Sequence, residues 1–265
     1  MNILERIYIA VFKEKARRKL FEKKLAGATH PDLHPVLDPA VAHFKHFGLI
    51  GDIIYAIPAM QVLAGGRSIH LHLEINRKSL YKKSMQHHNQ GKILTEKSVE
   101  MIAPLLLRQS GIEVVDILDG QRVDFDMDAF RDYPFDYNTN HICRWYFHRF
   151  GITADLGKPW LAVDPAPGMQ DEILIARSFR YRAPGISYKF LSAYPRVGFV
   201  GLPDEYEDLK KEIPGLVYHP VKNFLEMAQL IAGCKFFIGN QSSVPVSSTV
   251  RESAYSERKN SFAPT

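Results

Sequence analysis

Apolar and polar positions alternate along the chain in two ways that together predict a succession of strands and helices. Short runs with every second residue apolar are typical of strands, and longer runs with apolar residues three and four positions apart are typical of helices. The first part of the body has strand patterns just before residue 48 and at 69–75, 112–118 and 122–127, and helix patterns at 53–63, 98–109 and 142–150. The second part has strand patterns at 172–176, 197–200, 216–218 and 235–238, and helix patterns at 204–213 and 224–232. This alternation predicts an α/β protein whose parallel sheets are covered by helices on both faces.

A proline-rich interruption divides this pattern into two halves. Residues 158–170 (KPWLAVDPAPGMQ) contain three prolines and a glycine and follow neither periodicity. We therefore predict two Rossmann-like domains, at 41–165 and 170–243, with an arm and linker at 1–40 and a disordered tail at 244–265. A chain of 265 residues is long enough for two modest domains of this kind.

The first 25 residues carry the net charge of the chain. They contain eight basic and three acidic side chains, which accounts for the whole formal charge of +5 and leaves the remainder neutral. Because apolar residues recur at three- and four-residue steps between the basic ones, the segment predicts a basic amphipathic helix. Such a helix either lies on an anionic membrane surface or packs its apolar stripe against the body. Since the body is neutral, we expect no nucleic-acid partner.

No targeting or membrane-spanning segment is predicted. Charged residues interrupt the early apolar run, and no apolar run approaches the ~20 residues that a membrane span needs. The two cysteines, Cys143 and Cys234, lack metal-type spacing, so we expect reduced core cysteines. These features predict a cytoplasmic protein, and any contact of the basic arm with a membrane would be at its inner face.

The segment with the most chemical information joins the first strand to the first helix. A glycine-bracketed turn, Gly48–Gly51, is followed by Asp52 and an apolar helical run. Glycine lets a backbone approach a ligand closely, and a carboxylate is stabilised at a helix N-terminus. In open α/β sheets, ligands bind at the carboxyl ends of the strands, where this turn lies. Asp52 is therefore either a functional carboxylate or a plain helix cap.

A second polar turn follows the last strand pattern. The apolar run 235–238 leads into Gly239-Asn240-Gln241-Ser242-Ser243. With one such turn in each half, the cleft between the halves is the expected site.

These two segments together resemble a known family. GDIIYAIPAMQVL at 51–63 resembles the opening motif of the ADP-heptose:lipopolysaccharide heptosyltransferases, glycosyltransferase family 9, and NFLEMAQLIAGCKFFIGNQSS at 223–243 is similar to their nucleotide-sugar segment. The resemblance implies a GT-B fold. It also implies inverting transfer of a sugar from a nucleotide-diphosphate donor to a glycan or lipopolysaccharide-type acceptor, without a metal or any cofactor besides this co-substrate. Sugar-nucleotide epimerases share the same double-Rossmann plan and remain an alternative.

The resemblance also assigns roles to individual residues. Asp52 matches the position of the general base, on an acceptor-side loop with Gly48 and Gly51. The expected donor-binding residues follow the strands of the second half: Ser178, Arg180, Arg182, Gly201, Glu226, Gly239, Asn240, Gln241 and Ser242. Each has a simpler alternative: a solvated turn for 178–182, a helix cap for Gly201 and a helix N-terminal acid for Glu226.

Two departures from the family pattern favour another alternative, a non-catalytic nucleotide-sugar-binding protein. Gln241 stands where the family carries an aspartate, and Ser243 replaces a glycine. Residues 244–265 are serine-rich and cannot supply the strand and helices that would complete a GT-B domain. We therefore expect an incomplete second domain with an exposed strand edge at 235–238, whether from a shortened gene product, a change of reading frame or an artificial end.

Three further groups of residues invite a functional interpretation. His70 and His72 share one strand face and are expected to be polar-face or interface residues, since no carboxylate or cysteine completes a metal site. The group His141, Trp145, Tyr146, His148 and Phe150 either lines an acceptor pocket or belongs to the core, and we favour the core. Asp124, Asp126 and Asp128 alternate along the strand pattern at 122–127 and beyond, which suits either a cation site or an exposed edge, and we favour exposure of all three.

Overall fold

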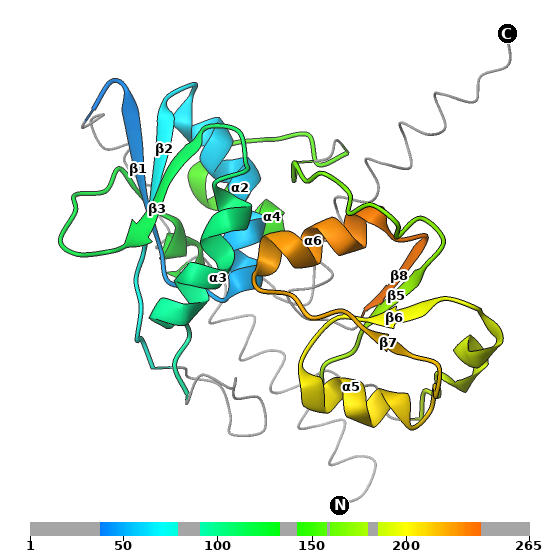
Figure 1. Ribbon diagram of the computed structural model, residues 1–265. Helices are drawn as coiled ribbons and strands as arrows, with labels where there is room; N and C mark the ends of the chain where they lie inside the picture. The colour runs from blue at the N-terminus through cyan, green and yellow to red at the C-terminus, as the bar shows by residue number, and fades with distance from the viewer. Residues whose placement is uncertain (1–37, 79–90, 133–141, 158–159, 180–184, 240–265) are drawn as a thin grey trace, which may run out of the picture.

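The computed structural model describes residues 38–78, 91–132, 142–157, 160–179 and 185–239. Within these ranges the chain forms two four-stranded parallel sheets, one from each half of the sequence (Figure 1). The predicted N-terminal helix, Arg180, Arg182, residues 240–243, the tail and His141 lie outside the described residues.

The first sheet has the strand order β3-β2-β1-β4. Its strands are β1 (Val41–His46), β2 (Ser68–Leu73), β3 (Ile112–Ile117) and β4 (Phe125–Asp126). The helices of this half are α2 (Ile50–Ala64), α3 (Glu96–Leu106), α4 (Ile142–Phe150) and the 3-10 helix η2 (Met127–Asp132).

Strict alternation along β1 and β2 gives this sheet one apolar face. Phe44 and Leu71 are fully buried in a core shared with α2, α3 and α4. The opposite face carries polar residues, including His43, His70 and His72, as predicted for the two β2 histidines. Within the described residues, helices therefore cover only the apolar face, and the expectation of cover on both faces is wrong for this part of the sheet. The physical reason is that alternating strands offer one face to a core, whereas strands buried on both faces are continuously apolar.

The second sheet repeats the first topology, with the order β7-β6-β5-β8. Its strands are β5 (Ile173–Ala176), β6 (Val197–Phe199), β7 (Val217–Tyr218) and β8 (Phe236–Gly239). The helix α5 (Pro203–Lys210) and the 3-10 helix η4 (Lys189–Ala193) pack on one face, and α6 (Phe224–Gly233) packs on the other. Because β5 is apolar at all four positions, both faces of this sheet are covered, as predicted. Among the described strands, β8 lies at an edge.

Helix α6 belongs to both halves. Its Ala228 and Ala232 are buried in the core of the first half, while Met227 and Ile231 pack under the second sheet. Figure 1 shows α6 between α3 and the strands of the second half. The two sheets are therefore joined through one shared helix.

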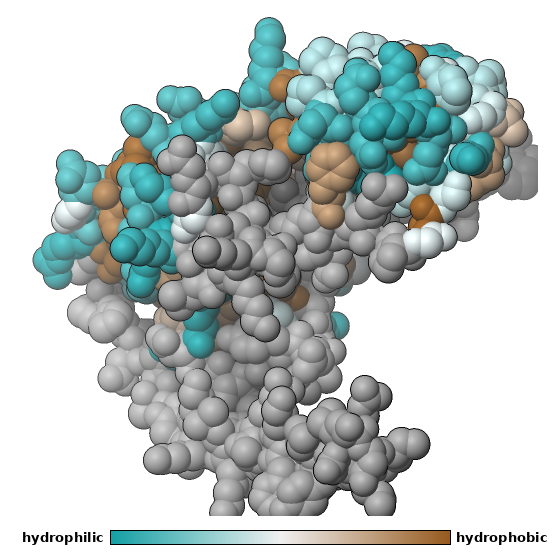
Figure 2. Space-filling model, turned by 90° about the horizontal axis from the view of Figure 1, so that it is seen from below, coloured by the Kyte–Doolittle hydropathy of each residue, from teal (hydrophilic) through white to brown (hydrophobic). Residues whose placement is uncertain are grey.

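The described face in Figure 2 is mostly polar, and the two cysteines lie in the interior. Seen from below, hydrophilic residues cover most of the described surface, with small hydrophobic spots between them (Figure 2). Cys143 and Cys234 are both buried, as predicted for core cysteines, and they form no disulfide. Burial raises the pKa of the Cys143 thiol to about 12, so this thiol stays protonated. No helix in the described ranges is long and apolar enough to cross a membrane.

Candidate active site

Asp52 lies at the carboxyl end of β1, in the first turn of α2. The helix begins at Ile50, so Asp52 is its third residue and Gly51 its second. The Asp52 Oδ2 atom accepts the backbone N–H of Leu49, the residue that precedes the helix, at 3.3 Å. The carboxylate thus acts as a helix-terminal acceptor and also stands at the sheet edge where ligands bind, so the two roles do not exclude each other.

Arg131 makes the strongest contact of this carboxylate. Its Nη2 donates to Asp52 Oδ2 at 2.7 Å from the 3-10 helix that follows β4. The guanidinium also lies over the rings of Phe130 and Phe47, with centroid distances of 4.6 Å and 5.2 Å. Burial by itself would lower the pKa of Arg131, but the charge and hydrogen bond of Asp52 raise it. Arg131 therefore remains a cation beside Asp52.

Gly48 lets these groups come together. A Cβ atom at this position would lie 2.4 Å from His46 Cε1, 2.8 Å from Arg131 Nη2 and 2.9 Å from Asp52 Cβ. No side chain can be accommodated at such distances without moving its neighbours. Close approach of side chains is thus the structural reason for this glycine.

A chain of hydrogen bonds supports the turn from below. The Nδ1 atom of the fully buried His46 accepts the backbone N–H of Gly48 at 2.7 Å, and its Nε2 lies 2.9 Å from the hydroxyl of Tyr146. That hydroxyl donates to the backbone oxygen of Asp52 at 3.0 Å. Burial, and then the charge of Asp52, raise the pKa of Tyr146 well above its ordinary value, so the phenol stays protonated.

Asp128 joins this network from the side of η2. Its Oδ2 accepts the backbone N–H of Phe47 at 2.7 Å, and its Oδ1 lies 3.2 Å from His46 Nδ1 and 3.6 Å from Arg131 Nε. Burial opposes its charge, but His46, Arg131 and the Phe47 N–H together hold the pKa of Asp128 below its usual value. Asp128 is therefore a buried carboxylate in the wall of the site.

The predicted exposure of the three alternating aspartates is wrong for two of them. Asp124 and Asp128 are buried, and only the side chain of Asp126, 44% exposed, meets the expectation. The strand predicted at 122–127 covers only Phe125–Asp126 and then turns into η2, so the three residues share no single face. The carboxylates that flank this short strand accept the backbone N–H groups of His43 in β1 and of Phe47 directly after it, and thus replace the bonds that a longer strand would make.

The described donor-side candidates gather at the carboxyl edge of the second sheet. Gly239 ends β8 and pairs with Ala176 of β5, two residues before Ser178. Gly201 follows β6 and accepts the Tyr218 hydroxyl through its carbonyl oxygen at 3.0 Å. Glu226 lies in the first turn of α6, where its carboxylate accepts the N–H of Lys222 at 2.8 Å. Arg180, Arg182, Asn240, Gln241 and Ser242 fall outside the described residues.

Two charged residues beside this edge were not singled out from the sequence. Arg177, next to Ser178, points inward, pairs with Asp208 and lies 3.6 Å from Glu212. Glu205 of α5 is buried and accepts the N–H groups of Phe179 and Leu202, at 3.0 Å and 3.3 Å. Glu205 thus ties together the loops after β5 and β6. Its position at the third residue of a helix that starts with proline is the one sequence signal for this role.

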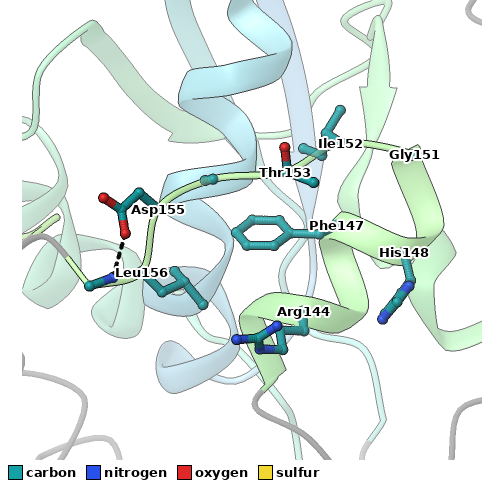
Figure 3. Close-up of a pocket in the computed structure, with 10 residues that line it drawn as sticks. Arg144, Phe147, His148, Gly151, Ile152, Thr153, Asp155 and Leu156 are labelled. Atoms are coloured by element: carbon teal, nitrogen blue, oxygen red, sulfur yellow. Dashed lines mark hydrogen bonds between the residues drawn. The ribbon is translucent and has the colours of Figure 1, made fainter.

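A separate surface pocket of about 530 Å³ lies beside α4. Arg144, Phe147 and His148 line it together with residues 151–157, and Figure 3 shows the Phe147 ring near its centre. Tyr146 points to the other side of α4, into the core. Burial of Tyr146 and Phe150 confirms the core interpretation for these members of the predicted aromatic group, whereas His148 belongs to the pocket.

The histidines of the first sheet bind each other rather than forming a metal cluster. His43 Nδ1 lies 3.0 Å from His72 Nε2, and His72 Nδ1 lies 2.6 Å from Asp116 Oδ1. Burial, followed by the neighbouring His72 and His70, lowers the pKa of His43. In the part of the chain that the structure describes, no group of three or more His, Cys, Asp or Glu residues is arranged to hold a metal ion.

The fold is similar to that of solved glycosyltransferases. Heptosyltransferase WaaC from E. coli, solved with ADP-2-deoxy-2-fluoro heptose, matches with a TM-score of 0.50 and 11% identity, over 80% of this chain and 86% of WaaC. The family 9 glycosyltransferase from Veillonella parvula matches with a TM-score of 0.52 and 13% identity, over 82% of this chain and 79% of that one. No protein family model and no curated protein matches the sequence. The resemblance inferred from the two sequence segments is thus confirmed at the level of architecture, and the chain has the GT-B-like α/β fold of the family 9 glycosyltransferases.

Proposed function

We propose that this chain is a glycosyltransferase that moves a sugar from a nucleotide-diphosphate donor to a hydroxyl of a glycan or lipopolysaccharide-type acceptor, with inversion and without a metal. The observation that carries the proposal is the Asp52 carboxylate at the carboxyl end of β1, bound by Arg131 at 2.7 Å. It lies in a fold shared with glycosyltransferases and at the sheet edge where such folds bind ligands.

Asp52 is the general base in this proposal. As the acceptor oxygen attacks the anomeric carbon, the carboxylate takes its proton, which in enzymes contributes about 10²–10⁴-fold to the rate. Two features support the assignment: the ionised partner Arg131, and the buried supports His46 and Tyr146 that hold the backbone of the turn. A base fixed in this way needs no reorganisation when the acceptor arrives.

The donor would bind at the carboxyl edge of the second sheet. Ser178, Gly201 and Gly239 end or follow strands there, and Glu226 opens α6 beside them. Helix N-termini and basic side chains neutralise a leaving diphosphate without a metal ion. The WaaC structures contain ADP and an ADP-sugar analogue, which supports a nucleoside diphosphate sugar as the donor class here. Arg180, Arg182 and the turn Asn240–Ser242 complete the proposed donor site.

Thermal melting against nucleotides tests the donor half of the proposal. ADP, UDP, GDP, CMP and their common sugar conjugates are added in turn, because a ligand at 100 times its dissociation constant stabilises the native state by about 2.7 kcal/mol. We expect a rise in melting temperature with one nucleotide and its conjugate. A protein that melts cooperatively without a shift for any of them contradicts the proposed donor site and supports a non-catalytic role.

Product analysis separates transfer from epimerisation. The donor identified by melting is incubated with and without a glycan acceptor, and the sugar product is followed by mass spectrometry and NMR. Transfer requires the acceptor and inverts the anomeric centre. Conversion of the sugar nucleotide without an acceptor would instead identify an epimerase on the same fold.

The location of the reaction is part of the proposal. We propose that the enzyme acts in the cytoplasm, with the basic residues of segment 1–25 contacting the inner face of a membrane that carries the acceptor. Binding of the full chain to anionic vesicles, compared with a chain that starts at residue 38, measures this contact.

A further inference from the structure

The two oxygens of the Asp52 carboxylate are in different situations. Oδ2 accepts hydrogen bonds from Arg131 and from the backbone of Leu49. No described residue makes a hydrogen bond to Oδ1. Oδ1 is also not one of the described side-chain atoms that are buried without a hydrogen-bond partner, so it is accessible to solvent. The side chain is 18% exposed. One oxygen is thus held by the protein, and the other is open to a molecule that arrives from solvent.

Arg131 is itself fixed in place. The Asp128 carboxylate lies 3.6 Å from its Nε, and the rings of Phe130 and Phe47 pack on its guanidinium. Its Nε atom is buried without a hydrogen-bond partner, so the guanidinium is tied to the protein mainly through Asp52 and these contacts. Arginine cannot give up its proton in a protein, so it can orient a base without competing for the proton that the base takes.

We propose that Arg131 is a positioning residue that selects the reacting oxygen of Asp52. By holding Oδ2, it presents Oδ1 to the acceptor hydroxyl. The acceptor oxygen then forms a bond to the anomeric carbon while its proton passes to Oδ1 of Asp52. The bond between the anomeric carbon and the diphosphate oxygen breaks, and the diphosphate leaves with its electron pair. This inference rests on the proposed glycosyl transfer and adds the residue that orients its base.

Gly48 makes the contact between Arg131 and Asp52 possible. Arg131 Nη2 would lie 2.8 Å from a Cβ atom at position 48, so the arginine reaches Asp52 only because that position lacks a side chain. The carboxylate, the arginine and the glycine come from three segments, at the start of α2, in η2 and after β1.

Steady-state kinetics of position 131 variants test this role. We expect Arg131→Gln to lower kcat about 100-fold with the KM values for donor and acceptor unchanged, because a misoriented reacting group costs about this much. Arg131→Lys keeps the charge but not the planar fork, and we expect it to recover only part of the rate. Arg131→Ala should regain activity when guanidinium is added at concentrations far below those that denature the protein.

Arg108→Gln is the matched control. Arg108 also pairs with an aspartate, Asp164, at 2.5 Å, but the pair is exposed and involves no residue of the candidate site. We expect its kcat and KM to equal those of the unaltered chain, and far-UV circular dichroism confirms that each variant is folded.

The outcomes separate this inference from the proposed function. If the unaltered chain transfers no sugar, the proposed function fails and the inference fails with it. If the chain is active and Asp52→Asn is not, but Arg131→Gln keeps the full rate, only the positioning role is overturned. A rise in KM at unchanged kcat would also overturn it, because Arg131 would then bind substrate directly.

Discussion

The two halves of the molecule have the same strand order but differ in the segment that follows their first strand. In the first half, β1 leads through a three-residue turn into the 15-residue helix α2, and Asp52 stands in its first turn. In the second half, no α-helix is described between β5 and β6, and the first basic residue after β5, Arg177, turns inward to Asp208. A shared topology therefore does not give shared chemistry, because the groups near each strand end decide whether a polar side chain is presented or buried.

Among the described residues, more side chains hold the turn that carries Asp52 than hold the corresponding edge of the second half. Four supports converge on its turn: His46, Asp128, Arg131 and Tyr146. The corresponding edge of the second half is held by Glu205, which binds the loops after β5 and β6. We propose that the first half holds a rigid reaction centre and that the second half binds the donor, and this comparison can be tested by substitution.

The largest expected effect separates chemistry from donor binding. Asp52→Asn keeps the size of the side chain but removes the base, so we expect the transfer rate to fall by about 10³-fold. The rise in melting temperature caused by the donor nucleotide should be unchanged, because Asp52 belongs to the other half. Ser178→Ala should behave in the opposite way, with a weakened nucleotide response and a smaller loss of kcat. Equal losses in both measurements for Asp52→Asn would contradict the division of roles.

A glycine comparison tests how tightly the first turn is packed. At Gly48 an added methyl group meets three side-chain atoms within 3.0 Å, whereas at Gly215, in the second half, it meets nothing within 4 Å. We expect Gly48→Ala to destabilise the protein by roughly 3 kcal/mol and Gly215→Ala to be neutral or slightly stabilising. Urea unfolding followed by far-UV circular dichroism measures both. A neutral Gly48→Ala variant would mean that the turn is looser than the contacts indicate.

The buried and exposed aspartates of η2 and β4 provide the next test. Asp128→Asn should cost about 2 kcal/mol of unfolding free energy, because the charged form accepts the Phe47 N–H and faces Arg131 and His46. Asp126→Asn removes only a half-exposed pair with Lys45 and should cost less than about 1 kcal/mol.

The pH dependence of stability in the Asp128→Asn variant has a defined sign. Since the folded protein holds the pKa of Asp128 below its ordinary value of 3.8, its charge stabilises the fold above that pH, and the stabilisation is lost as pH falls through the lower folded value. Asp128→Asn should therefore lose stability less steeply below pH 4 than the unaltered chain. Parallel acid-unfolding curves for the two would contradict this account.

The smallest expected effect concerns local opening. Each half has one buried cysteine, Cys143 in α4 and Cys234 after α6. Single-cysteine chains (Cys234→Ser or Cys143→Ser) report the opening of each half through the rate of thiol labelling at pH 8. We expect both to label slowly, with Cys143 a few-fold slower, because Cys143 belongs to the larger of the described hydrophobic clusters. Faster labelling of Cys143 would reverse the order of rigidity inferred for the two halves.

Much of the fold could be predicted because the local pattern and the final packing agree. The helix predicted at 142–150 is α4 to the residue, and every predicted strand has a counterpart. The β2 alternation correctly identified Leu71 and Leu73 as buried and His70 as a polar-face residue. Local pattern failed at 122–127, where the strand is two residues long, and at η4, which has no strong periodicity.

The sequence alone determined the order of elements, the two-sheet architecture and the turn that carries Asp52, because periodicity, glycine and helix-start chemistry are local properties. Only the tertiary structure decided the partners of that carboxylate. Arg131 lies 79 positions from Asp52, and Tyr146 lies 94 positions away. They meet because β4 pairs with β1 and α4 packs against α2. Contacts of this kind depend on where a chain returns after long connections, and no spacing in the sequence encodes that return.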